Sequence, residues 1–213
     1  MKHKLLIFFC LIKTCIYAQS ITYVNQNAMG KNDGTSWQDA FQTISEALKT
    51  KNSDTIKIMM GVYYASSTNN PNESLDLSNT EVIIGGYGAI GTEIKYDPIL
   101  FPTVISGDIG TAKDTTDNSY QLMQCKKNGG KIWIEGLQFE ESNGINAQFP
   151  KNKGGAIWID SNNAIANLEV IIRNCTFTKN RAQTGGAIYF NENFSDFSII
   201  PRIEYCTFDK NIS

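Results

Sequence analysis

One polar loop carries the side chains best suited to metal chemistry. Residues 106–119 read SGDIGTAKDTTDNS and include Asp108, Asp114, Asp117 and Asn118. Calcium takes carboxylate and amide oxygens in a flexible arrangement, so four such groups on one loop are candidate calcium ligands. The competing interpretation is that they are ordinary solvated loop residues. Apart from this candidate calcium, the sequence predicts no metal and no cofactor.

Histidine chemistry is excluded from most of the chain by composition. The only histidine is His3, close to the N-terminus, which leaves no partner for a Ser-His-Asp triad or a histidine-ligated zinc. Arg173 is expected to face outward, where an arginine could act as a base, but no matching acid is expected on the neighbouring repeats. No motif indicates the paired carboxylates of an inverting glycosidase. We therefore predict no catalytic residue.

Exposed aromatic side chains provide a binding hypothesis. Phe194 and Phe197 lie in residues 191–200, and a second variable stretch occupies residues 160–169. Insertions in successive repeats commonly gather on one face, and exposed aromatic rings suit sugars or protein partners. The alternative is that both rings fold back over the wall of the molecule.

These loops separate the copies of an internal repeat. Residues 154–184 read GGAIWIDSNNAIANLEVIIRNCTFTKNRAQT, and residues 185–213 read GGAIYFNENFSDFSIIPRIEYCTFDKNIS. Gly154 and Gly185 are 31 residues apart, as are Phe177 and Phe208. Self-similarity at a fixed period indicates a solenoid, propeller or array.

Each copy contains two short apolar segments that favour strands over helices. The segments are residues 156–159 with 187–190, and residues 170–177 with 201–208. Ile172 and Cys175 are three apart, so both can face a core only if the chain turns a corner between them. The same spacing recurs at Ile203 and Cys206.

A strand, a loop and two strands around a corner make one coil of a parallel β-helix. Coils stack about 4.8 Å apart, which predicts Phe177 under Phe208 and an amide ladder of Asn180 and Asn211. A looser copy at residues 131–142 places Phe139 on the same stack, with an insertion in residues 143–153. A β-propeller needs four strands and about 40–45 residues per blade, which is more than this repeat provides.

The paired motifs GGAI and F-x-x-N, seen here as FTKN and FDKN, resemble the repeats of chlamydial polymorphic outer-membrane proteins. The upstream segments NDGTSWQDAFQTISEAL and EVIIGGYGAIGTE look like the N-terminal half of secreted pectin-lyase-like proteins. The resemblance implies a right-handed parallel β-helix, an all-β solenoid. It implies little about activity, because this fold carries lyases, hydrolases and adhesins alike.

The N-terminal region predicts export and a cap. Residues 1–18 have a basic start, an apolar core and Ala18, which indicates a signal peptide rather than a membrane span. The β-helix domain is predicted over residues 19–213, with a cap at 19–54 and coils at 55–213. Trp37, Phe41, Ile44 and Leu48 have helical spacing, so residues 37–49 are expected to form a capping helix.

The net charge of the chain indicates which classes of binding partner are expected. The chain has 19 basic and 21 acidic residues, and loss of the three lysines of residues 1–18 leaves a net charge of −5. Scattered, mildly acidic charge does not suit nucleic acid. We expect a secreted, extracellular or bacterial outer-membrane surface protein. Its expected role is that of an adhesin, binding a polysaccharide or a host or cell-surface protein without catalysis.

Two further expectations follow from the resemblance and the repeat. The alternative function is a calcium-dependent polysaccharide lyase, because lyases of this fold hold calcium against a uronate carboxylate and use Arg or Lys as base. The second copy stops at Ser213, two residues after Asn211, before a further coil. We therefore expect a chain truncated at its C-terminus that self-associates through an open last coil.

Overall fold

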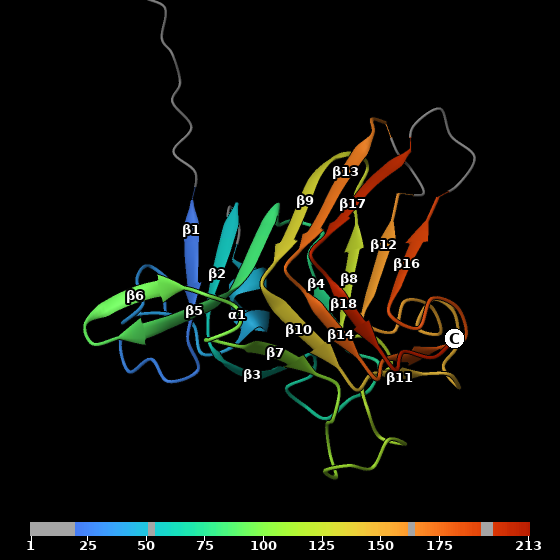
Figure 1. Ribbon diagram of the computed structural model, residues 1–213, viewed down its shortest axis with the longest axis horizontal. Coiled ribbons are helices and arrows are strands. Elements are labelled where there is room, and N and C mark those ends of the chain that lie inside the picture. The colour runs from blue at the N-terminus through green and yellow to red at the C-terminus, as the bar shows by residue number, and fades with distance from the viewer. Residues whose placement is uncertain (1–19, 51–53, 162–164, 193–197) are drawn as a thin grey trace, which may run out of the picture.

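The strands wind into an all-β parallel solenoid of about five turns (Figure 1). The computed structural model describes residues 20–50, 54–161, 165–192 and 198–213. Coils follow one another from the blue N-terminal strand on the left of Figure 1 to the red strands on the right. Right-handed winding stays a prediction, supported by the strong preference of parallel crossover connections for that hand.

The first sheet holds one strand from each coil. In spatial order its parallel strands are β1 (Ile21–Val24), β2 (Thr55–Met59), β5 (Val82–Ile90), β9 (Gly130–Glu135), β13 (Leu168–Arg173) and β17 (Ile199–Glu204). One further strand, β6 (Glu93–Tyr96), pairs antiparallel with β5.

Two other parallel sheets and a small strand pair complete the wall. The second sheet contains β3 (Gly61–Tyr64), β7 (Thr103–Ser106), β10 (Leu137–Glu140), β14 (Thr176–Thr178) and β18 (Thr207–Asp209). The third contains β4 (Leu75–Asp76), β8 (Met123–Lys126), β12 (Ile157–Asp160) and β16 (Ile188–Asn191). The pair is β11 (Asn143–Gly144) with β15 (Arg181–Ala182).

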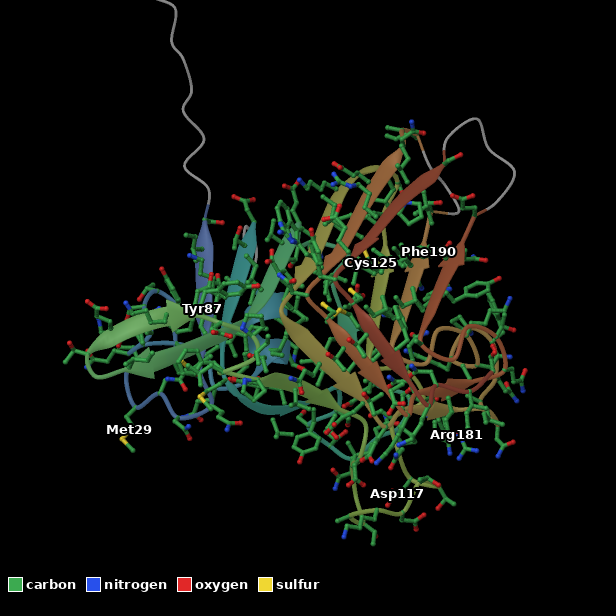
Figure 2. The ribbon with its side chains drawn as sticks, viewed as in Figure 1. Met29, Tyr87, Asp117, Cys125, Arg181 and Phe190 are labelled. Atoms are coloured by element: carbon green, nitrogen blue, oxygen red, sulfur yellow. The ribbon has the colours of Figure 1, made fainter. Side chains whose placement is uncertain are left out.

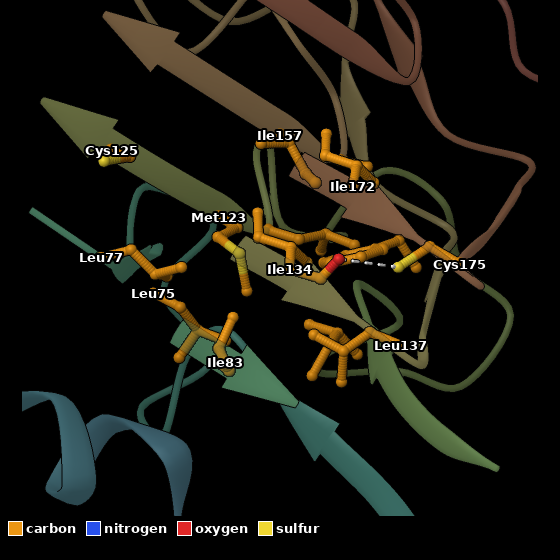
Figure 3. Packing of buried hydrophobic residues seen from close by; sticks show 14 of the residues in the cluster. Leu75, Leu77, Ile83, Met123, Cys125, Ile134, Leu137, Ile157, Ile172 and Cys175 are labelled. Atoms are coloured by element: carbon orange, nitrogen blue, oxygen red, sulfur yellow. Dashed lines mark hydrogen bonds between the residues drawn. The ribbon is translucent and has the colours of Figure 1, made fainter. Parts of the chain in front are cut away.

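The repeat alignment predicts the observed stacks. Ile134, Ile172 and Ile203 are register partners on successive coils, and so are Phe139, Phe177 and Phe208. The phenylalanine rings stack with centroids 5.1 and 4.8 Å apart. Figure 3 shows Leu75, Met123, Ile134 and Ile157 directed into the same interior. Every coil therefore contributes to one continuous apolar core.

The corner between the first and second sheets uses left-handed backbone. Gly136, Asn174 and Tyr205 lie at this corner on three successive coils, with φ angles of 67°, 51° and 53°. Glycine and asparagine adopt this conformation readily, whereas a tyrosine does so at a cost. The corner predicted at residues 173–174 and 204–205 is confirmed.

A ladder of amides closes the next corner. The Asn211 Oδ1 atom accepts hydrogen bonds from the backbone N–H and the side-chain amide of Asn180, at 3.0 and 3.1 Å. Asn180 Nδ2 also donates to the Phe139 carbonyl, and Asn211 Nδ2 to the Phe177 carbonyl. Both amides, of which Asn180 is fully buried, thus satisfy backbone groups of the adjacent coil.

The N-terminal helix is shorter than the sequence predicts. Helix α1 spans Ile44–Lys49 rather than residues 37–49, and its capping box joins Thr43 to Glu46. Ser36 and Asp39, which resemble a capping box in sequence, do bond to each other but hold a turn. Helix α1 buries Ile44 and Ala47 in the core. A capping role for it stays a prediction.

Another difference is the β5–β6 hairpin. The apolar residues 82–84 followed by two glycines predict a strand that ends there, but β5 continues through the glycines to Ile90. The register between β2 and β5 shifts at this point, from Lys57 opposite Ile84 to Met59 opposite Tyr87. A bulge that contains glycine redirects a strand without ending it.

The export segment, residues 1–18, lies outside the described residues. Within the described ranges, no helix has the length and apolar character needed to span a membrane.

Candidate functional site

Four aromatic side chains contact one another in succession beside the first sheet. Tyr23, Trp37, Tyr87 and Tyr96 succeed one another with ring centroids 4.8, 5.3 and 5.5 Å apart. All four lie outside the apolar core and are partly exposed. We call this set the aromatic row.

Three separate structural features bring the row together. Tyr23 points outward from β1 by the strand alternation. Trp37 lies in the turn that Ser36 and Asp39 hold. Tyr87 and Tyr96 are register partners across the β5–β6 hairpin, which Figure 2 shows beside the label of Tyr87. The row therefore joins two coils, a turn and a hairpin.

Cations flank the rings on this face. Lys57 Nζ lies 5.6 Å from the centroid of the Tyr87 ring, and Lys131 Nζ lies 4.7 Å from that of Trp133. Both distances lie within the range of cation–π attraction. The lysines keep donors beside the aromatic surfaces, a combination that suits a ligand with apolar faces and hydroxyl groups.

Glu135 fixes the far end of the row. Its carboxylate accepts hydrogen bonds from the Tyr96 hydroxyl at 2.7 Å, from Trp133 Nε1 at 2.9 Å and from the Asn174 amide at 3.2 Å. Burial and the bond to Glu135 raise the pKa of Tyr96 above its ordinary value. Tyr96 therefore stays a neutral donor, and the carboxylate holds in place one side chain from β6, one from β9 and one from the corner at Asn174.

Arg173 continues this face beyond Glu135. Its guanidinium lies 5.5 Å from the Tyr205 ring centroid. The expectation that no acid aligns with Arg173 is wrong, because its register partners on the two adjacent coils are Glu135 and Glu204. Both carboxylates have other partners, since Glu204 pairs with Arg202 at 2.6 Å. That Arg173 has no catalytic role stays a prediction.

The candidate calcium ligands stabilise their own loop. Asp108 accepts from the Lys113 N–H, Asp117 accepts from the Thr111 N–H, and the Asn118 amide donates to the Glu141 carbonyl. Bonds from the hydroxyl and N–H of Thr116 lower the pKa of Asp114. In the described ranges, no group of three or more His, Cys, Asp or Glu residues is arranged to hold a metal ion.

The two aromatic residues proposed from the sequence, Phe194 and Phe197, lie outside the described residues. Sequence reasoning missed the aromatic row. The outward position of Tyr23 in its strand was a usable signal, because Tyr23 lies between buried residues. No signal in the sequence pointed to Trp37, because its spacing places it among the apolar residues of the expected helix.

The comparisons with known proteins bear on the repeat. Residues 174–195 match the Chlamydia polymorphic membrane protein (Chlamydia_PMP) repeat. No curated protein and no solved structure matches the chain. The matched segment begins at the corner residue Asn174 and contains both FTKN and the second GGAI. Residues 174–195 are therefore a repeat of the Chlamydia polymorphic membrane protein type, set in a β-solenoid.

Proposed function

We propose that this protein is a non-catalytic, adhesin-like surface protein that binds a carbohydrate chain along the aromatic row. The observation that carries the proposal is the unbroken succession of partly exposed rings at 4.8–5.5 Å. Sugar rings have apolar faces that pack on aromatic rings, and hydroxyl edges that bond to polar groups. Lys57 lies where it can serve such an edge.

The direction of the row supports a chain-like ligand. The ring centroids of the row follow one another at the similar spacings of 4.8, 5.3 and 5.5 Å. A polymer of similar units can place successive units on successive rings. The matched family's name refers to membrane proteins, which supports a location at the bacterial outer-membrane surface.

Substitution of Trp37 tests the proposal. Trp37 contacts both Tyr23 and Tyr87, so Trp37→Ala removes the centre of the row. Binding to a panel of neutral and acidic polysaccharides is measured by affinity electrophoresis. The wild type should be retarded by at least one polysaccharide, and Trp37→Ala should weaken that interaction by about tenfold or more.

The matched control is Tyr64→Ala, because Tyr64 is an exposed aromatic residue on β3 of the second sheet. It should leave binding unchanged. Equal retardation of the wild type and Trp37→Ala would refute the proposal. If no polysaccharide retards the wild type, the ligand would instead be a host or cell-surface protein. Release of unsaturated uronates in the presence of calcium, lost in Asp114→Ala or Arg173→Ala, would favour the lyase.

A further inference from the structure

A lysine, a glutamine and an aspartate lie in contact beside the third sheet. Asp76 on β4 and Gln124 on β8 are register partners on adjacent strands. Gln124 Nε2 donates to Asp76 Oδ2 at 3.3 Å, and Lys151 Nζ donates to Gln124 Oε1 at 3.4 Å. The carboxylate accepts and the lysine donates, so both neighbours fix the orientation of the amide. One amide therefore has an amine beside its oxygen and a carboxylate beside its nitrogen.

These three groups are the ones that an exchange of amides requires. An amine attacks an amide at its carbon, and the old nitrogen leaves only when it gains a proton. The Oε1 atom of Gln124 is bonded directly to Cδ, so Lys151 Nζ lies close to the carbon under attack. Asp76 contacts the nitrogen that would leave. Nucleophile, carbonyl carbon and proton carrier are thus already side by side.

Lys151 has the ionisation that a nucleophile needs. Only the neutral amine has a free electron pair, and an exposed lysine is almost entirely protonated near neutral pH. Burial is the main cause that lowers the pKa of Lys151 to about 8, the Lys126 ammonium adds to this effect, and Asp76 opposes it. Ser74 Oγ accepts from Lys151 Nζ at 2.6 Å and holds the amine in position. A substantial fraction of the molecules therefore carries a positioned, neutral amine near pH 8.

A second amide lies at the same distance but has no acid beside it. Lys151 Nζ is also 3.4 Å from Gln121 Oε1. Gln121 Nε2 donates to the Lys153 carbonyl, and a carbonyl oxygen cannot carry a proton to a leaving nitrogen. The geometry therefore selects Gln124 over Gln121 as the reacting amide.

We propose that Lys151 and Gln124 form an intramolecular isopeptide bond, with Asp76 as the proton carrier. The electron pair of Lys151 Nζ forms a bond to Gln124 Cδ, and the carbonyl π pair moves to Oε1. Both nitrogens are then attached to one carbon, so the Asp76 carboxylate takes a proton from Nζ and passes it to Nε2. The pair on Oε1 returns, the bond from Cδ to Nε2 breaks, and ammonia leaves. The atoms and electrons balance without an oxidant or a reductant.

The bond ties residues 143–153 covalently to β8. Gln124 and Lys151 are 27 positions apart in the chain, so the bond closes a loop of that length. A cross-link removes conformational entropy from the unfolded chain and thereby raises the free energy of unfolding. The bond also consumes the amine, so Lys151 contributes to any pH dependence of stability only in molecules in which the bond has not formed.

The test is the intact mass of the folded protein, followed over time near pH 8. The wild type should lose the mass of one ammonia, and fragment spectra of a digest should show a branched peptide that contains Gln124 and Lys151. Lys151→Met and Gln124→Met should form no branched peptide. Protein held in urea should form none either, because unfolding separates the three groups. A wild type of unchanged mass, or an ammonia loss that maps only to other residues, would overturn the proposal.

Asp76→Asn tests the proton carrier in a variant that should keep the fold. Asp76 is exposed, and an asparagine retains the Oδ1 atom that accepts from Ser78. The substitution should slow formation of the bond by about 100-fold or more. The matched control is Asp33→Asn, because Asp33 Oδ1 accepts from Thr35 in the same way in the N-terminal region. Asp33→Asn should leave the rate unchanged, whereas an unchanged rate in Asp76→Asn would contradict the proposed mechanism.

Discussion

At the residue scale, the phenylalanine stack allows a comparison of identical side chains with different coverage. Phe177 is fully buried between Phe139 and Phe208, whereas Phe208 is 49% exposed. Phe177→Ala should lower the free energy of unfolding by about 3–5 kcal/mol, because a large buried ring leaves a cavity. Phe208→Ala should cost much less. Urea unfolding of the three proteins measures the difference, and equal losses would contradict the assigned coverage.

Ile171 shows where strand alternation misleads. The sequence places it one residue off the inward register, and it is indeed absent from the core cluster. It is nevertheless only 6% exposed, with Trp133 and Arg202 as register partners on either side. Alternation tells which face a side chain takes, but the neighbouring strands decide how far that face is covered. Ile171→Thr should still cost less than Phe177→Ala.

Inward residues were predictable and the aromatic row was not, for a physical reason. A 31-residue period fixes which residues stack, so Ile172, Phe177 and Asn180 could be placed before the structure was known. Trp37 and Tyr96 belong to a turn and a hairpin outside the repeat. Trp37 and Tyr96 come close to Tyr87 only because β5 changes direction at its bulge. The sequence of residues 82–90 does not predict that change of direction.

At the element scale, a lysine is among the residues that attach residues 143–153 to earlier coils. Lys151 Nζ donates to Ser74 Oγ at 2.6 Å and approaches the Oε1 atoms of Gln121 and Gln124 at 3.4 Å. Burial is the main cause that lowers the pKa of Lys151 from 10.5 to about 8, with a smaller contribution from Lys126 and an opposing one from Asp76. The Lys151 ammonium group that bonds this loop to Ser74 is therefore largely buried.

This lowered pKa predicts a pH dependence of stability. Between about pH 8 and 10.5 the unfolded chain keeps the Lys151 proton and the folded chain does not. Unfolding then takes up a proton, so the contribution of Lys151 to stability rises with pH across this window. The free energy of unfolding of the wild type should therefore increase relative to Lys151→Met from pH 8 to 10.5. Urea titrations at several pH values check this, and parallel curves for the two proteins would count against it.

At the scale of the whole molecule, the last coil leaves three strand edges open. Strands β16, β17 and β18 end their sheets, so within the described ranges each pairs with a strand on one side only. Apolar side chains accompany these edges, since Ile203, Tyr205 and Phe208 are 44%, 78% and 49% exposed. Unpaired edges with apolar neighbours are templates for another chain.

The last prediction is that this 213-residue chain self-associates through that coil. A second copy can pair its own β17 and β18 edges and cover the exposed apolar residues, which neither copy can do alone. Light scattering over a wide concentration range should show a mass that rises with concentration. Phe208→Lys should reduce the association, because it places a charge at the centre of the contact while Phe177 remains buried beneath it. Tyr64→Ala, on β3 at the opposite end of the second sheet from β18, should have no effect. A constant monomer mass at high concentration would show that these edges do not pair between copies.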